Sequence, residues 1–154
     1  PALRLFEKQA VVIGGGVNHR MGLYDQILIK DNHIDYAGSV QAAVEGAHRH
    51  LAYVGRQVPV VVEVRDLEEV NAALAVGGVD RLLLDNFSPE EARATVAHIA
   101  GAVPTEASGG LTPDTVRAYG EAGVDFVSLG WLTHSPVSLD ISLKSAAALA
   151  ALQA

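Results

Sequence analysis

Short apolar segments alternate with helix-start signals along most of this chain, and this alternation limits the folds open to it. Segments 58–64 and 81–84 are dense in Val and Leu, as buried strands are. Each is followed by a helix start: Asp66 with a glutamate three residues later, and Ser88 followed at once by proline. A strand and a helix that repeat every roughly 20 to 30 residues are typical of a parallel α/β sheet.

The same reasoning extends to the whole chain. Strands are predicted over residues 10–13, 27–30, 58–64, 81–84, 105–108 and 126–129. Helices are predicted after Asp66, Ser88 and Thr112, over the apolar stripe Val40, Ala43, Val44, Ala47 and Leu51, and over 142–152.

Right-handed crossovers join such units either into a (β/α) barrel or into a doubly wound sheet. A complete eight-stranded barrel takes about 250 residues, whereas this chain has 154. We therefore expect an α/β fold that is an incomplete (β/α) TIM-like barrel of about six parallel strands. No linker or low-complexity tract divides the sequence, so residues 1–154 are interpreted as one barrel domain.

Composition excludes several functions. The chain has no cysteine, which rules out disulfides and thiolate chemistry. It has 11 Lys and Arg against 18 Asp and Glu, for a net charge of -7, which argues against nucleic acid as a partner. No signal peptide or apolar run long enough to span a membrane is visible, and a cytoplasmic location is expected.

Positive groups gather in one segment of this acidic chain, residues 14–33. It contains His19 and Arg20, and Lys30 follows a short apolar run that is typical of a buried strand. A strand that delivers a lysine at its C-terminal end presents a charge to a substrate in many α/β enzymes. The segment is therefore a candidate anion site, although a flexible glycine turn and a solvated loop would leave the same pattern.

Polar or glycine residues stand at the downstream end of most predicted strands: Lys30, Glu63, Asp85, Ser108 and Gly130. Strand ends on one face of a barrel point into a common space, so a shared site is expected there. Two carboxylates from neighbouring strands suit Mg2+ bound through water and substrate phosphates. The alternative is that Glu63 and Asp85 merely stabilise neighbouring helix N-termini.

Two glycine turns follow the last two predicted strands. Their backbone amides can approach a phosphate closely, and the phosphate site of a barrel often lies at this position. Ordinary turn geometry is the alternative. The candidate phosphate-binding residues are Ser108, Gly109, Gly110, Leu129, Gly130, Trp131 and His134.

Five motifs, in order, carry a resemblance to a known family. They are NHRMGLYDQILIKDNHI, EV, LLLDNFSPEE, EASGG and SLGWLTHS. Together they resemble the C-terminal barrel domain of the quinolinate phosphoribosyltransferases, the decarboxylating nicotinate-nucleotide pyrophosphorylases of NAD synthesis. The resemblance covers essentially the whole chain, and the NHR…LIKDNHI segment is the most specific part of it.

The resemblance implies an activity and a set of roles. The reaction is transfer of a phosphoribosyl group from phosphoribosyl pyrophosphate to quinolinate with decarboxylation, with Mg2+. The resemblance implies that His19, Arg20 and Lys30 bind quinolinate and the ribosyl group. It also implies that Glu63 and Asp85 handle the ribose hydroxyls and the metal, and that the two glycine turns hold phosphate.

The resemblance also implies an organisation. Members of the family have an N-terminal sandwich domain and a Thr-Arg-Lys-Thr motif before the position of Pro1, and they form homodimers. We therefore expect the 154 residues alone to bind phosphate without turnover. Two alternatives remain open: a related phosphoribosyl-binding protein with another substrate, and a barrel fragment without catalysis. Trp131 departs from the smaller residue that is more frequent in the family.

Overall fold

Five parallel strands form one sheet in the computed structural model, which describes residues 3–143. The sheet order β1-β2-β3-β4-β5 follows the chain, so every strand pairs with the one before it. Register partners include Ile27 with Val60 and Asp85 with Ser108. The strands are β1 Ile27–Ile29, β2 Val60–Val64, β3 Arg81–Asp85, β4 Thr105–Ser108 and β5 Phe126–Val127.

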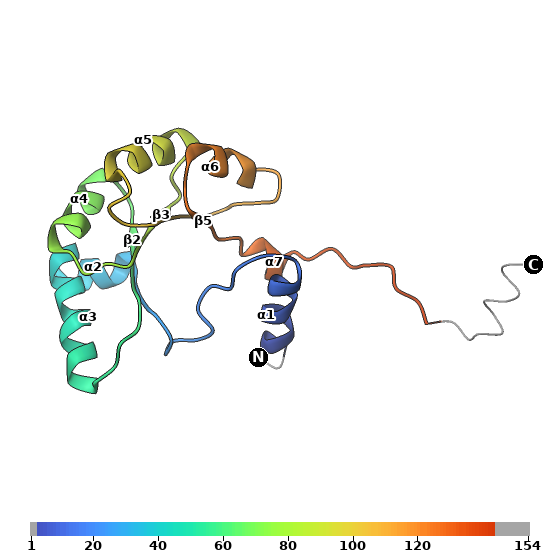
Figure 1. Ribbon diagram of the computed structural model, residues 1–154, viewed down its shortest axis with the longest axis horizontal. Coiled ribbons are helices and arrows are strands. Elements are labelled where there is room, and N and C mark those ends of the chain that lie inside the picture. Colours follow the sequence, from blue (N-terminus) through green and yellow to red (C-terminus); the bar gives the residue numbers. More distant parts are fainter. Residues whose placement is uncertain (1–2, 144–154) are drawn as a thin grey trace, which may run out of the picture.

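Helices connect successive strands and line one side of the sheet. Figure 1 shows α3, α4, α5 and α6 as an arc around the strands, with α1 apart from that arc beside α7. No helix within residues 3–143 has both the length and the apolar character needed to cross a membrane. The helices are α1 Arg4–Ile13, α2 Asp31–Ala37, α3 Val40–Val54, α4 Leu67–Val76, α5 Pro89–Ile99, α6 Val116–Ala122 and α7 Trp131–His134.

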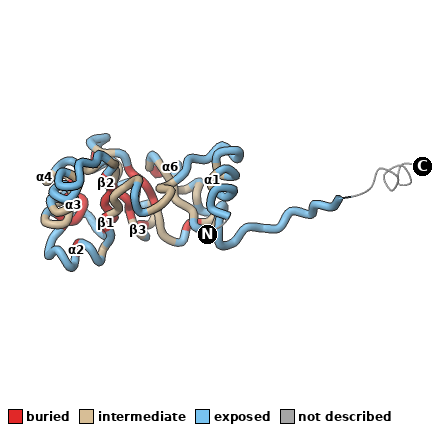
Figure 2. Tube along the Cα trace, turned by 90° about the horizontal axis from the view of Figure 1, so that it is seen from below, coloured by how far each residue is buried: buried red, intermediate tan, exposed pale blue. Residues whose placement is uncertain are grey.

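The two faces of the sheet have different chemistry. Val62, Leu82 and Leu84 belong to the hydrophobic core that the helices cover. Since side chains alternate along a strand, Glu63 and Glu106 project to the opposite face. Buried residues concentrate on the strands, whereas α1 is mostly exposed and residues 135–143 are exposed (Figure 2). The apolar face thus builds the core, and the polar face is left for a site.

Helix starts follow the predicted caps at two positions. The Asp66 carboxylate accepts the Glu69 N–H at the start of α4. Ser88 and Glu91 form a capping box at α5, with proline at its first position. The third start differs: a turn occupies 112–115, closed by the Thr112 N–H donating to Thr115 Oγ1, and α6 begins only at Val116.

The predicted strand over 10–13 is wrong, because these residues are the last four of α1. Their apolar run is too short for periodicity to separate a strand from the end of a helix, and good helix formers precede it. The sheet therefore has five strands in the described residues rather than six. Its order ends at β1 and β5, so it is open there, and closure into a barrel is not seen within residues 3–143. Ser142 and Leu143 are not helical, and the rest of the helix predicted over 142–152 lies outside the described residues.

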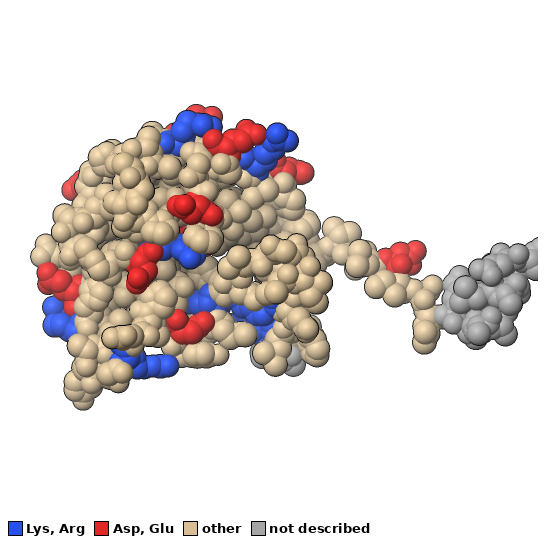
Figure 3. All heavy atoms as spheres, viewed as in Figure 1, with Lys and Arg blue, Asp and Glu red and all other residues tan. Residues whose placement is uncertain are grey.

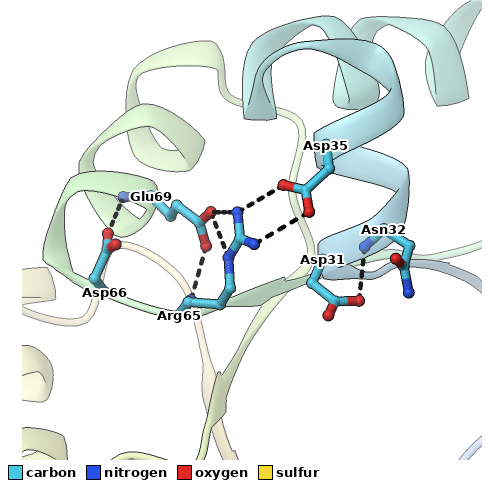
Figure 4. A network of polar contacts seen from close by, with 6 residues as sticks. All are labelled: Asp31, Asn32, Asp35, Arg65, Asp66 and Glu69. Atoms are coloured by element: carbon cyan, nitrogen blue, oxygen red, sulfur yellow. Dashed lines mark hydrogen bonds and ion pairs between the residues drawn. The ribbon is translucent and has the colours of Figure 1, made fainter.

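Arg65 joins two helices at the C-terminal end of β2 (Figure 4). Its guanidinium donates to Glu69 at the start of α4, at 2.5 and 2.9 Å, and to Asp35 in α2, at 3.0 Å. These carboxylates, Glu69 first, raise the pKa of Arg65 further above its usual range. The contact fixes the beginning of α2, where Lys30 lies, relative to the end of β2, where Glu63 lies.

Candidate functional site

The parallel sheet brings the predicted strand-end residues to one edge. Lys30 follows β1 directly, Glu63 is the fourth residue of β2, and Asp85 ends β3. Asp85 is the register partner of Ser108 at the end of β4. These four residues therefore lie at one edge of the sheet, and the shared site predicted there and their roles in binding remain predictions.

Lys30 and Glu63 form the central ion pair of this edge. Nζ of Lys30 lies 3.4 Å from Oε2 of Glu63; the lysine side chain is 48% exposed and the glutamate side chain only 8%. Burial raises the pKa of Glu63, Lys30 opposes that shift, and Asp85 adds to it as a second negative charge. Glu63 is thus a carboxylate held in a costly charged state, as groups at functional sites often are.

The backbone around Asp85 explains why residue 109 is glycine. Asn86 donates from Nδ2 to Asp85 at 2.8 Å and has a left-handed φ of 58°. Its N–H donates to the Ser108 carbonyl, which brings the two loops together. A Cβ on Gly109 would lie 2.9 Å from the Asn86 nitrogen and closer still to its Oδ1, at a φ of 98°. Gly109 is therefore required by packing, whatever it binds.

A cavity of about 420 Å³ lies between α1 and the ends of β4 and β5. Five of the predicted site residues line it: His19, Arg20, Ser108, Leu129 and Gly130. The space-filling view shows basic and acidic side chains together between the helical arc and α1 (Figure 3). The predicted residues that do not line this cavity are Lys30, Glu63, Asp85, Gly109, Gly110, Trp131 and His134.

A second cavity, of about 790 Å³, lies beside β1, α2 and α3. Arg20, Lys30 and His33 line it, together with apolar residues of β1 and small residues of α3. Arg20 borders both cavities. The predicted anion-binding residues are thus divided, with His19 at the first cavity, Lys30 at the second and Arg20 between them.

The loop that carries Arg20 is held by its own carboxylate. Asp25 accepts the N–H groups of Met21 at 2.7 Å and Gly22 at 3.0 Å. These two hydrogen bonds lower the pKa of Asp25 below its usual range. The loop conformation is therefore tied to an ionised Asp25.

Sequence reasoning missed the contribution of α1 to the first cavity. Nζ of Lys8 donates to the carbonyls of His19 at 2.5 Å and Arg20 at 3.0 Å, and Arg4 donates to the Met21 carbonyl at 2.5 Å. The spacing of Arg4 and Lys8 puts both on one side of a helix. That signal was lost because the end of α1 was interpreted as a strand.

Glu106 is the second residue that was missed. It lies in the middle of β4 and is only 1% exposed. Oε2 accepts from Nη1 of Arg81 at 2.7 Å, and Oε1 accepts from the Ser128 hydroxyl. The same Oε1 lies 3.7 Å from Nε2 of His19. Two of these three neighbours, His19 and Ser128, line the first cavity, so the buried carboxylate lies directly behind its wall.

The side chains that could hold a metal are few. No group of three or more His, Asp or Glu gathers in metal-binding geometry within residues 3–143. Glu63 and Asp85 offer two carboxylates, and the charge of Asp85 acts on Glu63 by raising its pKa. Such a pair resembles the usual protein contribution to a Mg2+ site, in which water and substrate phosphates supply the remaining ligands.

Comparison with known proteins shows which family this sequence matches. The profile of the family described as quinolinate phosphoribosyl transferase, C-terminal domain, matches residues 1–144. The chain is 46% identical to a probable nicotinate-nucleotide pyrophosphorylase [carboxylating] of Bacillus subtilis, over 93% of this chain and 48% of that protein. It is 44% identical to the chloroplastic enzyme of that name from rice, over 94% of this chain and 43% of that protein.

Solved structures agree with the sequence comparison. The crystal structure of NadC from Streptococcus pyogenes superposes with a TM-score of 0.85 at 46% identity, covering 94% of this chain and 50% of that one. Sequence and fold therefore both match over nearly the whole chain. The chain spans about half the length of the relatives that it matches.

Proposed function

The chain belongs to the quinolinate phosphoribosyltransferase family, whose C-terminal domain it matches, and from this we propose its activity. Quinolinate and phosphoribosyl pyrophosphate react to give nicotinate mononucleotide, carbon dioxide and pyrophosphate. The observation that carries the proposal is the placement of two cations, Arg20 and Lys30, on one cavity wall, with two carboxylates, Glu63 and Asp85, at the adjoining strand ends. A dianionic ring and a ribose that becomes positive need these opposite charges.

Arg20 and Lys30 serve the quinolinate carboxylates in this proposal. Both border the cavity beside β1, and Lys30 has a side chain about half exposed, so its ammonium can reach a ligand. Arginine binds a carboxylate through two parallel N–H groups, whereas lysine acts as a point charge. Together they orient a planar dicarboxylate with its ring nitrogen toward the strand ends.

Glu63 and Asp85 serve the ribosyl group. Departure of pyrophosphate leaves positive charge on the ribose, and carboxylates held in place stabilise it without reorganisation. The Glu63 carboxylate is nearly buried, which strengthens its interaction with that charge. After transfer the ring nitrogen is cationic and accepts the electron pair of the breaking C–C bond as carbon dioxide leaves.

The amides near Ser108, Gly109, Gly110 and Gly130 serve the phosphate in this proposal, with Leu129, Trp131 and His134 beside them. Support comes from the first cavity, which Ser108, Leu129 and Gly130 line together with Lys8. Gly109 and Gly110 have positive φ values and leave the backbone uncovered by a side chain. His134 packs near Gly130, so its imidazole stands at the same turn.

Mg2+ is proposed as the cofactor, with Glu63 and Asp85 as the residues that would hold it. The residues fit the ion because they are two oxygen donors at neighbouring strand ends. When bound, Mg2+ supplies positive charge that neutralises the departing pyrophosphate. The protein's own part is to keep the Asp85 carboxylate oriented, which the hydrogen bond from Asn86 does.

We also propose that the sheet is an arc of an incomplete barrel. Strands that follow chain order with helices on one side are the arrangement of (β/α) barrels, and the curved row α3 to α6 supports it (Figure 1). The exposed apolar side chains of α1, among them Leu5, Phe6 and Ile13, favour burial against another surface. A homo-oligomer is proposed on that ground.

The test is ligand discrimination. Calorimetry with the chain should show tighter binding of quinolinate than of nicotinate, because only quinolinate has the second carboxylate for Arg20 and Lys30. Equal affinity for both compounds would favour a phosphoribosyl-binding relative with another substrate. No affinity for either would leave the fold assignment intact and contradict the proposed substrate.

A further inference from the structure

A continuous line of contacts runs across the polar face of the sheet to the loop between the two cavities. Arg81, at the start of β3, lies over the ring of Phe126 at 3.9 Å and donates to Glu106 at 2.7 Å. Glu106 faces Nε2 of His19 at 3.7 Å, and Nδ1 of His19 accepts the N–H of Arg20 at 2.8 Å. No residue of this line except His19 and Arg20 was a candidate from sequence.

Both ring nitrogens of His19 are therefore directed at the protein. Nδ1 is an acceptor, so a neutral imidazole carries its proton on Nε2, facing the Glu106 carboxylate. A histidine that served as a direct substrate ligand would keep one nitrogen turned to the cavity. Here the ring instead bridges a buried carboxylate and the backbone of the next residue.

We propose that Glu106 is a positioning residue that acts through His19 to place Arg20 between the two cavities. The inference rests on the proposed function, in which Arg20 binds a quinolinate carboxylate. Glu106 is a sound anchor because Arg81 and the Ser128 hydroxyl hold it from two sides in a buried place. Arg20 lies in a loop, and its position is defined more precisely when a residue on a strand of the sheet holds that loop.

The charges around His19 support this role. Burial lowers the pKa of His19; Glu106 acts against that shift, whereas Arg20, Lys8 and Arg81 add to it. The ring is therefore neutral at neutral pH, which matches an acceptor at Nδ1 and a donor at Nε2. Because the His19 ring is neutral, Arg20 supplies the positive charge that the His19-Arg20 dipeptide offers to an anion.

The first experiment is NMR of the His19 ring nitrogens in the chain and in Glu106→Gln. Glutamine keeps an acceptor for Arg81 but removes the negative charge, so the pKa of His19 should fall further. Wild type should show the proton on Nε2. Glu121→Gln is the matched control, because Glu121 pairs with Arg117 on the exposed side of α6, and it should leave His19 unchanged. An unchanged His19 pKa in Glu106→Gln, or a proton on Nδ1, overturns the proposal.

The second experiment compares two replacements of His19. Asparagine places an oxygen where Nδ1 stands and can still accept the Arg20 N–H, whereas glutamine places its amide near Nε2. Each variant keeps only one of the two contacts of the ring, so we expect both to bind quinolinate about ten- to a hundredfold more weakly than wild type. Binding within a few-fold of wild type by either variant would show that the line through His19 does not place Arg20, and would overturn the proposal. This comparison also decides the matter if Glu106→Gln does not fold.

The two experiments separate the inference from the proposed function. The NMR measurement needs no substrate, so it tests the link from Glu106 to His19 directly. If wild type binds no quinolinate while Glu106→Gln shifts the His19 pKa, the positioning link stands and the substrate assignment fails. If quinolinate binds and the His19 pKa does not move, the substrate assignment stands and the link fails.

Discussion

Lys30 directly follows β1 and Glu63 lies in the adjacent strand β2, and their charged atoms lie 3.4 Å apart at the end of the sheet. The pair is unequal, because the lysine reaches solvent while the glutamate is nearly buried. Burial therefore outweighs the attraction of the lysine, and the pKa of Glu63 is raised. A nearly buried carboxylate at this site therefore lowers the stability of the fold, a cost that functional sites commonly carry.

Glu63→Gln should make the protein more stable and less active. Because the folded-state pKa of Glu63 is raised, the folded protein binds more protons than the unfolded chain between the ordinary glutamate value and the raised value. The free energy of unfolding thus falls as pH rises through that window, and it stays lowered at pH 7. Thermal unfolding at pH 7 should give a higher Tm for Glu63→Gln, and this gain should vanish below the ordinary glutamate pKa.

In a protein of the relatives' full length, Glu63→Gln should lower turnover by about 10²–10³-fold, the size seen when one electrostatic stabiliser is lost. Asp85→Asn should behave alike, and quinolinate affinity should change far less in both. Near-normal turnover in both variants would remove these acids from the mechanism.

Arg20→Ala should weaken quinolinate binding by about 2–5 kcal/mol, the cost of removing one partner of a buried charge contact. Binding of phosphoribosyl pyrophosphate should change little, which calorimetry can measure separately. Arg117→Ala is the matched control, since Arg117 is exposed on α6 and pairs with Glu121 of the same helix. Equal weakening of both ligands by Arg20→Ala would show that Arg20 is structural.

Gly109→Ala should destabilise the fold by about 1–3 kcal/mol, because a methyl group would collide with Asn86 at a left-handed φ. Gly110→Ala is the control: its φ is also positive, but no atom of the described residues lies within 4 Å of the added group. Asn86→Gly in the Gly109→Ala background should restore part of the loss. Urea unfolding measures all three, and equal losses at 109 and 110 would contradict the close approach.

Asp25→Asn should flatten the acid side of the stability profile. The pKa of Asp25 is lowered by the Met21 and Gly22 amides, so its contribution is present above the ordinary aspartate value. That contribution is lost as pH falls through the lowered pKa. Unfolding of wild type and Asp25→Asn should therefore differ at pH 6 and converge in strong acid. A constant difference across this range would mean that the carboxylate charge does not hold the loop.

Phosphate should protect the 154-residue chain against thermal unfolding, whereas the chain with both substrates and Mg2+ should release little carbon dioxide. The candidate phosphate residues Ser108 and Gly130 lie within the chain, but catalysis needs both substrates in near-attack geometry, worth up to about 7–11 kcal/mol. Carbon dioxide release near that of a full-length relative would contradict the second half. Lack of protection by phosphate would contradict the first.

Local signals in the sequence predicted most of the sheet. Dense β-branching marked β2, and the caps at Asp66 and Ser88 marked α4 and α5, because each depends on neighbours in the chain. The strand predicted over Ala10–Ile13 was wrong because its local signal is too short. Four apolar residues show no periodicity, so only packing decides between strand and helix.

The candidate site residues at strand ends could be predicted from the sequence, whereas those that depend on contacts between distant parts of the chain could not. Lys30 and Asp85 are found by counting to the end of an apolar run. Glu106 lies inside a four-residue strand. Its proposed role depends on contacts with Arg81, Ser128 and His19, which are distant in sequence. Lys8 reaches the site only because α1 folds back onto the loop after it.

The chain-order sheet also governs how the protein can assemble. Register partners on neighbouring strands are between 20 and 33 residues apart, so each new strand closes only a short loop onto a neighbour already made. Such contacts can form one unit at a time as the ribosome releases the polypeptide. Synthesis in the N-to-C direction thus extends the sheet from β1 toward β5, and the buried Glu106 meets Ser128 only when β5 has emerged.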